Sequence, residues 1–256
     1  RPSAGRTCRP WPALLAGAAE TVITPDATGT FLIGPMRPST GVSDDLYARV
    51  LLLSDRRTSA AIVTLDWLGV DFAFNDVLVR SVAAATGIPP ERVLINCSHT
   101  HSAPLTIPWG PWEKAKDKPF HRFLPRRLAA AARRARAALA PARLRHGRAA
   151  AQVGINRRLP TPSGTVMAPN PHGTIIPWVD VLSIERAEGG LIALLFSHAA
   201  HPVIVHSAST LISADWPGFA VRALREARGD GGIYMFAQGC GANINGCPLK
   251  GGVGAA

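Results

Sequence analysis

Short apolar runs, each bounded by polar residues or glycine, are the first regular feature of this chain. Val, Ile, Leu and Ala dominate these runs, and their lengths are typical of strands. The segment Glu188-Gly189-Gly190 separates two of them in the way that a hairpin turn does. We therefore predict strands at residues 17–24, 47–53, 59–68, 92–97, 178–185, 191–197 and 232–237.

Three other segments repeat their apolar residues at helical spacing. Asn75 or Asp76 could cap a helix that ends at Gly87. A second helix, residues 125–139, carries Leu and Ala on one side and Arg on the other. A third helix covers residues 215–228. Helices that alternate with strands predict an α/β fold of mixed α and β structure, in which mixed sheets are flanked by helices.

The chain is strongly basic, with 28 Lys and Arg residues against 17 Asp and Glu residues and a formal net charge of +11. Much of the excess lies between His121 and Arg148, where the polar side of the second helix consists of arginine. A solvated surface explains such a helix, and peripheral contact with an anionic membrane surface is the alternative. Because this side of the helix lacks aromatic residues, nucleic acid is a less favoured partner.

Neither the apolar runs nor the cysteines indicate a membrane-spanning or disulfide-stabilised protein. No run approaches the roughly 20 apolar residues that cross a bilayer, and residues 1–12 lack the continuous apolar centre of a signal peptide. Cys8, Cys97, Cys240 and Cys247 are spaced too irregularly for a disulfide framework or a paired zinc site. A soluble protein is the resulting prediction. Since the first residue is Arg, we also consider a lost leader, and with it secretion or a periplasmic location.

Histidines follow directly on two of the predicted strands. His99 and His101 come after one strand, and His201 comes after another. Side chains two positions apart point to the same side of an extended chain, so His99 and His101 are expected to converge. Neutral imidazole is a common zinc ligand whose second nitrogen needs an acceptor, for which Asp66 or a nearby hydroxyl is a candidate. Two strand ends that deliver histidine predict a metal site, with hydrogen-bonded core histidines as the alternative.

Polar residues also stand where a predicted helix begins and where the last predicted strand ends. Asp215 is either a helix cap or an outer acceptor for a metal ligand, and we favour the cap. The small-residue turn at residues 239–245 could bring backbone N–H groups close to an anionic or carbonyl ligand. Cys240 within this turn is more consistent with a buried small residue than with a nucleophile. The sequence contains no serine-esterase elbow, phosphate loop or dinucleotide fingerprint.

The order of these motifs resembles the neutral/alkaline non-lysosomal ceramidase family. The matching segments are Ala16 to Pro25, Asp45 to Arg49, Gly87 to Glu91, Ser98 to Ser102, Gly154 to Arg158, His201-Pro202, Ile212 to Asp215 and Gln238 to Asn245. They extend across nearly all of the chain. The resemblance implies that residues 13–256 form one ceramidase-like catalytic domain, incomplete at its carboxy-terminal end, after a leader or disordered start at residues 1–12.

The resemblance implies a zinc-dependent hydrolase that cleaves the amide of ceramide or of a related N-acyl lipid. In this family two histidines, a glutamate and a tyrosine hold the zinc ion. His99 and His201 match the two histidines, and the other two ligands would lie beyond Ala256. The zinc ion would polarise the carbonyl and lower the pKa of a bound water, while neighbouring donors stabilise the oxyanion.

The same resemblance assigns roles to other residues of the site. It implies that His101 lines the pocket and that Arg157 contacts the substrate or the intermediate. Asp66 and Asn243 are our further candidates for substrate contacts, and Asp215 is the candidate acceptor that would orient a metal ligand from behind.

One departure from the family concerns Asn245. The family places a serine there that is proposed as its nucleophile, and an amide side chain cannot take that role. Either water activated by the metal attacks directly, or the chain belongs to a divergent branch with another reaction or substrate. The alternatives to ceramide hydrolysis are therefore a metal-dependent hydrolase of another amide or ester, or a catalytically silent basic module that binds anionic lipid or nucleic acid.

Overall fold

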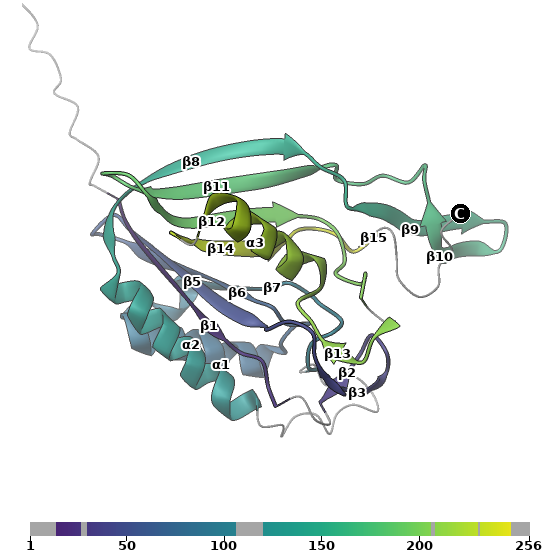
Figure 1. Ribbon diagram of the computed structural model, residues 1–256, viewed down its shortest axis with the longest axis horizontal. Helices are drawn as coiled ribbons and strands as arrows, with labels where there is room; N and C mark the ends of the chain where they lie inside the picture. The colour runs from purple at the N-terminus through teal and green to yellow at the C-terminus, as the bar shows by residue number, and fades with distance from the viewer. Residues whose placement is uncertain (1–13, 27–29, 106–119, 206–207, 230, 247–256) are drawn as a thin grey trace, which may run out of the picture.

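The computed structural model contains one eight-stranded sheet that consists of two halves (Figure 1). It describes residues 14–26, 30–105, 120–205, 208–229 and 231–246. The first half contains β1 (Leu15–Val22), β5 (Tyr47–Ser54), β6 (Ser59–Leu65) and β7 (Val93–Cys97). The second half contains β8 (Ala140–Ala150), β11 (Trp178–Arg186), β12 (Leu191–His198) and β14 (Ile233–Gln238).

The strand order is β14-β12-β11-β8-β1-β5-β6-β7, so β14 and β7 are the two edge strands. The halves meet through a short antiparallel pairing, in which Leu15 lies opposite Pro141 and Ala16 opposite Ala140. The inner strands pair antiparallel, whereas each edge strand runs parallel to its neighbour, β7 to β6 and β14 to β12. Within each parallel pair, the carboxyl ends of both strands therefore lie at the same end of the sheet.

Apolar side chains on both faces of the strands form the core. On β5, Leu51 and Leu53 pack against residues of the second half, whereas Val50 and Leu52 belong to the core beneath the helices. On β14, Met235 faces the first half, and its neighbours Tyr234 and Phe236 lie in the cluster under the third helix. Strands that are buried on both faces have nearly continuous apolar sequences, which explains why the runs were recognisable.

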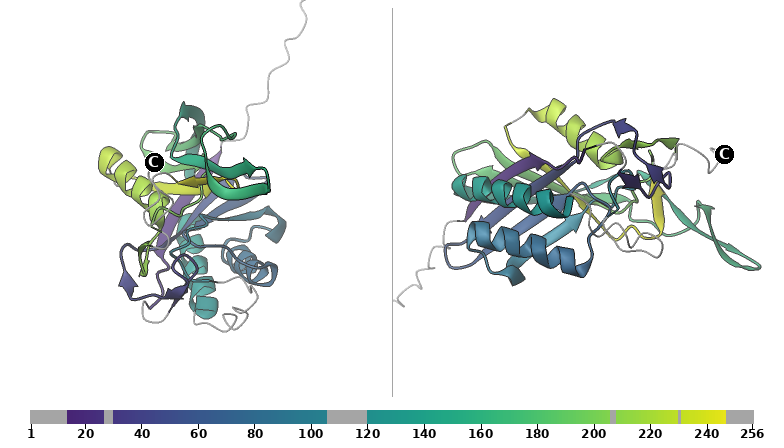
Figure 2. Two further views of the ribbon diagram at one scale, coloured as in Figure 1. Left: turned by 90° about the vertical axis from the view of Figure 1, so that its right-hand side faces the viewer. Right: turned by 90° about the horizontal axis from the view of Figure 1, so that it is seen from below.

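Helices cover the outer face of each half, so the molecule has four layers. The helices α1 (Phe72–Thr86) and α2 (Phe120–Ala137) lie side by side on the first half, as the right-hand view of Figure 2 shows. The helix α3 (Asp215–Arg228) packs on β14 in the second half. Gly17 of β1 allows α2 to approach closely, because a Cβ there would collide with the carbonyl of Ala135.

A second, three-stranded sheet extends away from the main sheet as an arm (Figure 1). It has the order β10-β9-β15, formed by β10 (Gly164–Asn170), β9 (Gly154–Thr161) and β15 (Ile244–Gly246). The short strands β2 (Phe31–Leu32), β3 (Arg37–Pro38), β4 (Gly41–Val42) and β13 (Leu211–Ile212) form two small pairs elsewhere. The base of the arm is important for the site, because β9 and β15 begin there.

The predicted fold class is confirmed, and each predicted strand and helix is present, the third helix with the predicted bounds and the others with altered boundaries. The prediction that Asn75 or Asp76 caps the first helix was wrong. The cap is Asp71, whose carboxylate accepts a hydrogen bond from the N–H of Phe74 at 2.7 Å. Pro125, expected to open the second helix, lies inside it.

The strand β8 and the arm were not predicted. Most of β8 is exposed, and Arg143, Arg145 and Arg148 interrupt its small and apolar residues, so it lacks the apolar run that identifies a core strand. Among the described residues, no helix has both the length and the apolar character needed to cross a membrane. The leader or disordered start predicted at residues 1–12 lies outside the described residues, and the predicted domain division remains a prediction.

Candidate metal centre

The candidate site lies where the carboxyl ends of the two parallel strand pairs come together. His99 and His101 follow β7, and His201 follows β12. Hydrogen bonds continue the parallel pairing beyond the strands, from the N–H of Ser98 to the carbonyl of Leu65 and from the N–H of His99 to the carbonyl of Trp67. The first histidine is therefore fixed by the extension of the β6–β7 ladder.

His99 has a positive φ of 70°, a conformation that side chains other than glycine seldom adopt. The expectation that an extended chain makes His99 and His101 converge was therefore wrong in its premise, although the two rings do lie together. Thr100 between them is buried and donates to the carbonyl of Ser213 at 2.8 Å. A backbone conformation that costs free energy is held here by surrounding hydrogen bonds, which is common at functional sites.

His201 is held by the segment that follows β14. Its N–H donates to the carbonyl of Ile244 at 2.9 Å, and it forms an isolated parallel bridge with Asn245. The N–H of His101 donates to the carbonyl of Pro202 at 3.3 Å, so the two histidine segments also contact each other directly. Three stretches of chain that are distant in sequence therefore meet at this end of the sheet.

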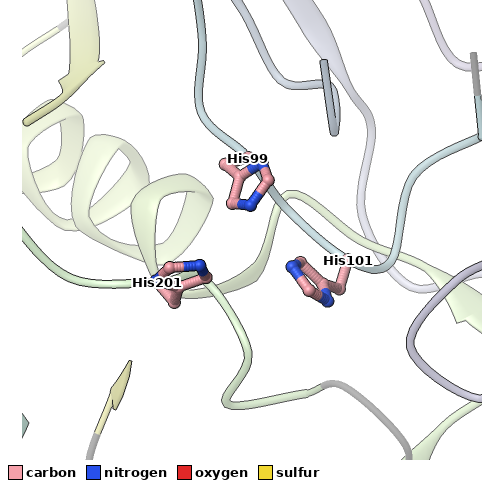
Figure 3. Close-up of side chains that lie close together, drawn as sticks. All are labelled: His99, His101 and His201. Carbon is pink, nitrogen blue, oxygen red and sulfur yellow. The ribbon is translucent and has the colours of Figure 1, made fainter. Parts of the chain in front are cut away.

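The three imidazole rings point toward one another (Figure 3). The ring centroid of His99 lies 5.1 Å from that of His101 and 5.0 Å from that of His201, and the remaining pair is 5.9 Å apart. One nitrogen from each ring lies within 4.8 Å of the others. Among the described residues, this group is the cluster that could hold a metal ion.

Backbone carbonyls set the protonation of two rings. Nδ1 of His99 lies 2.7 Å from the carbonyl of Leu68, and Nδ1 of His201 lies 2.8 Å from that of Gly241. A carbonyl oxygen only accepts, so each Nδ1 carries the proton and each Nε2 keeps its lone pair for another partner. This is the usual arrangement behind a metal-binding histidine. The prediction that Asp66 or a hydroxyl provides this acceptor was wrong.

Burial keeps these imidazoles neutral. It lowers the pKa of His201 to about 4, with a further contribution from the nearby Arg157 guanidinium. Burial likewise lowers the pKa of His99, which its hydrogen bond to Leu68 partly opposes. Metal ions bind the neutral form of imidazole, so both rings are in the binding-competent form at neutral pH.

The Arg157 guanidinium lies against the cluster. Its Nε donates to the carbonyl of Ala242 at 3.0 Å, its Nη1 to Oδ1 of Asn245 at 3.0 Å, and its Nη2 to Nε2 of His201 at 3.2 Å. Burial lowers the pKa of this arginine. The structure thus brings Arg157, Asn245 and His201 together, and Asn245 serves as an acceptor for the guanidinium.

A pocket of about 430 Å³ opens beside His99, His201 and Arg157. Its other lining residues are Leu68, Asn96, Cys97, Arg158, Gln238, Gly239, Gly241 and Ala242. Burial raises the pKa of the Cys97 thiol to about 12, so this cysteine is a neutral wall residue and not a nucleophile. Cys240, which we expected to be buried, is exposed.

Two predicted substrate-binding residues do not line this pocket. Asp66 is buried in an ion pair, where its Oδ2 accepts from Arg49 at 2.8 Å and from the N–H of Tyr47 at 3.0 Å. It borders a separate, smaller pocket near α3. The side-chain amide of Asn243 donates to the carbonyl of Thr174 at 2.9 Å. Both residues therefore make structural hydrogen bonds, and their contacts with a substrate stay a prediction.

Asp215 braces the segment that follows His201. It is fully buried with a positive φ of 57°, and its carboxylate accepts from the N–H groups of Ile204 at 3.2 Å and Val205 at 2.8 Å. It also accepts from the N–H of its neighbour Trp216. The cap that we favoured for Asp215 was wrong, because Ala214 is the N-cap of α3 and makes no side-chain cap hydrogen bond. Its carboxylate thus holds the backbone of the segment that follows His201.

Other histidines lie outside the cluster. The ring of His198 is hydrogen-bonded to the carbonyl of Trp178 at 2.8 Å, and His206 lies outside the described residues.

Two residues that line the pocket, Asn96 and Gln238, were given no role from the sequence. Gln238 belonged to a matching motif, and Asn96 immediately precedes a pocket cysteine, but neither has a local pattern that reveals a role.

The donor set fits a zinc ion. Two nitrogens bound to tetrahedral zinc at about 2.0–2.1 Å are roughly 3.4 Å apart. Nitrogens that already lie within 4.8 Å of one another reach that spacing through small side-chain adjustments. Arg157 would have to withdraw from Nε2 of His201 for that nitrogen to become a ligand.

Comparisons with known proteins support the fold at low sequence identity. No family model and no curated protein matches the chain. Among solved structures, it is similar to the crystal structure of neutral ceramidase from Pseudomonas aeruginosa, with a TM-score of 0.78 and 22% identity over 95% of this chain and 41% of that chain. It is also similar to a structure described as ceramidase complexed with C2, with a TM-score of 0.75 and 22% identity over 91% of this chain and 39% of that chain.

The chain therefore spans about two fifths of the length of the ceramidases that it resembles. At this level of identity the similarity establishes the fold, and it confirms that the resemblance found in the sequence was correct at the level of fold.

Proposed function

We propose that this chain provides the histidine part of a zinc-dependent hydrolase that cleaves the amide of ceramide or of a related N-acyl lipid. The observation that carries the proposal is the convergence of His99, His101 and His201, whose nitrogens lie within 4.8 Å of one another. The similarity in fold to neutral ceramidase supports the substrate class. Two of the rings owe their tautomers to backbone carbonyls, as metal ligands commonly do.

In this proposal His99 and His201 bind the metal through Nε2, and His101 presents the third imidazole to the same point. A bound zinc ion would polarise the substrate carbonyl and lower the pKa of a bound water. The residues of the chain have the remaining tasks of holding, orienting and shielding the scissile amide.

Arg157 is the proposed donor to the substrate carbonyl. Its guanidinium lies in the pocket wall next to the ligand nitrogen of His201, where an oxyanion forming near the metal would be within reach. Asn245 accepts one of its N–H groups, and the carbonyl of Ala242 accepts another. Both contacts orient the guanidinium. Asn245 thus supports an arginine at the place where the ceramidase family has its serine.

A metal-dependent hydrolase of another amide or ester is the second candidate. Asn245 favours it, because its amide is hydrogen-bonded to Arg157 and has no nucleophilic character.

The alternative of a catalytically silent basic module that binds anionic lipid or nucleic acid has less support. Arg127 and Arg134 of α2 donate to backbone carbonyls of β1, and Arg148 of β8 is paired with Asp180. Peripheral membrane contact stays a prediction.

The deciding experiment is elemental analysis of the protein purified without chelator, followed by assays on matched N-acyl amide and ester substrates. We expect about one zinc ion per chain, its loss in His99→Ala, and its retention in His198→Ala, since His198 is a buried histidine outside the cluster. Zinc content that is equal in both variants would contradict the ligand assignment. Cleavage of esters without amides would favour the second candidate.

A further inference from the structure

The two edge strands of the eight-stranded sheet meet at the end that carries the histidines. β7 and β14 are at opposite ends of the strand order, yet they contact each other. No backbone ladder joins them. The contact is made by the side chain of Asn96, the penultimate residue of β7, and by the backbone of Gln238, the last residue of β14.

Asn96 pairs with Gln238 as a peptide group would. Its Nδ2 donates to the carbonyl of Gln238 at 3.2 Å, and its Oδ1 accepts from the N–H of Gln238 at 2.8 Å. A carboxamide has the same donor and acceptor as a backbone amide, so one side chain satisfies both backbone groups of an edge residue. Of the hydrogen bonds between described residues, these two connect the edges of the sheet directly.

The side chain of Gln238 continues this connection to the second histidine segment. Its Nε2 donates to the carbonyl of Ala200 at 3.0 Å, and the next residue is His201. At the other end, Asn96 lies three residues before His99. Both side chains line the pocket beside the histidines. We call these three hydrogen bonds the edge clasp.

We infer that the edge clasp, formed by Asn96 and Gln238, positions His99 and His201 at the separation that a shared metal ion requires. Neither Asn96 nor Gln238 is a metal ligand in the proposed site, so both are positioning residues. This inference rests on the metal site proposed above. Within the clasp the bonds act in series, because the connection passes through Asn96, the backbone of Gln238 and the side chain of Gln238 in turn. It acts beside the direct contact between His101 and Pro202.

Hydrogen bonds that act in series predict a particular pattern of zinc affinities, because breaking a second bond adds little once the first is broken. The test measures zinc dissociation constants by competition with a chromophoric chelator for Asn96→Leu, Gln238→Met and the double variant, all of which are nearly isosteric and leave the charge unchanged. We expect each single variant to lose about 10-fold in affinity, at the low end of the usual effect of residues behind metal ligands. We expect the double variant to lose no more than either single variant.

The matched control is Thr64→Val. Thr64 is buried on β6 directly opposite Asn96 in the β6–β7 register but belongs to neither histidine segment. We expect it to bind zinc like the parent protein. Losses that multiply in the double variant would overturn the serial clasp, and so would parent-like affinity in both single variants. The visible absorption of the cobalt-substituted protein gives a second readout, because a changed ligand geometry alters this spectrum.

Backbone hydrogen exchange of the metal-free protein separates this inference from the proposed function. Asn96→Leu should accelerate exchange at the N–H of His201, which donates to Ile244 and does not contact Asn96. Exchange in the β1–β5 core should stay unchanged. Unchanged exchange at His201 would overturn the clasp even if the parent protein binds no zinc. If Asn96→Leu unfolds as a whole, Gln238→Met alone decides by the same two measurements.

Discussion

The histidine end of the sheet and the ribbon formed by β8 and β11 both carry histidine and arginine, but the surroundings of these side chains differ. His201 is 7% exposed, has its Nδ1 on a backbone carbonyl and has a pKa lowered to about 4. His146 of β8 is 66% exposed and lies 3.4 Å from Asp180 of β11. The difference shows that burial and backbone acceptors, and not the presence of histidine, create the conditions for metal binding.

The largest expected effect separates the two regions by their histidines. His201→Ala should weaken zinc binding by more than about 100-fold, because a lost ligand costs more than the loss of a residue behind a ligand. His146→Ala should bind zinc like the parent protein. Isothermal titration of the metal-free proteins measures both. Comparable losses in the two variants would remove the distinction between the site and the ribbon.

A methyl group added to a glycine should produce the next largest difference. A Cβ on Gly241 would lie 2.8 Å from the backbone nitrogen of Ala200, whereas a Cβ on Gly147 of β8 would meet nothing within 4 Å. Gly241→Ala should therefore destabilise the protein by about 1–3 kcal/mol and weaken zinc binding, since the carbonyl of Gly241 orients His201. Gly147→Ala should be neutral. Chemical denaturation tests both, and equal stability would contradict the close packing at Gly241.

Replacing Arg157 and replacing Arg148 should have different effects. Arg157→Leu removes a positive charge beside His201 and frees its Nε2, so zinc binding should tighten by roughly 10-fold. Turnover should nevertheless fall by roughly 100-fold if Arg157 holds the substrate carbonyl. Arg148→Leu on β8 should change neither quantity. A metal titration combined with a turnover assay measures this split, and weaker zinc binding in Arg157→Leu would count against the proposed position of the guanidinium.

The smallest effect is expected at the ion pair of the ribbon. Hydrogen bonding to Arg148 lowers the pKa of Asp180, so the contribution of this carboxylate to stability is present above its ordinary pKa of about 3.9 and is lost as pH falls through the lowered value. Both side chains are exposed, and salt screens such pairs. Asp180→Asn should lower the melting temperature slightly at pH 7 in low salt and not at all in 1 M salt. A loss that persists in high salt would indicate a structural role.

How much the sequence predicts depends on whether an element is buried. β5 and β14 were predictable because apolar residues fill both of their faces. β8 was not, because its long exposed surface is stabilised by pairing with β11, a partner that the local sequence does not reveal. Burial on both faces produces an apolar pattern in the local sequence, whereas pairing between distant strands produces no such pattern.

The same limit applies to the site. His99 and His201 could be predicted, since each follows directly on an apolar strand. The convergence of their rings depends on two parallel edge pairs whose carboxyl ends coincide, and on a positive φ at His99. The roles given to Asp66 and Asn243 stay predictions, and the sequence did not reveal that Arg49 and backbone groups hydrogen-bond these side chains. Which groups hydrogen-bond a given side chain depends on the folded structure and cannot be read from the local sequence.

The edge clasp has a consequence for the order of folding. Asn96 and Gln238 are 142 residues apart, and closing a loop of that length costs conformational entropy before any contact compensates for it. The β6–β7 unit can form from neighbouring segments, but the three histidines meet only after β14 has docked. Metal uptake during refolding should therefore be among the last events, slower than the appearance of helix and strand signals. The rate of zinc binding would then report the rate at which the native topology is completed.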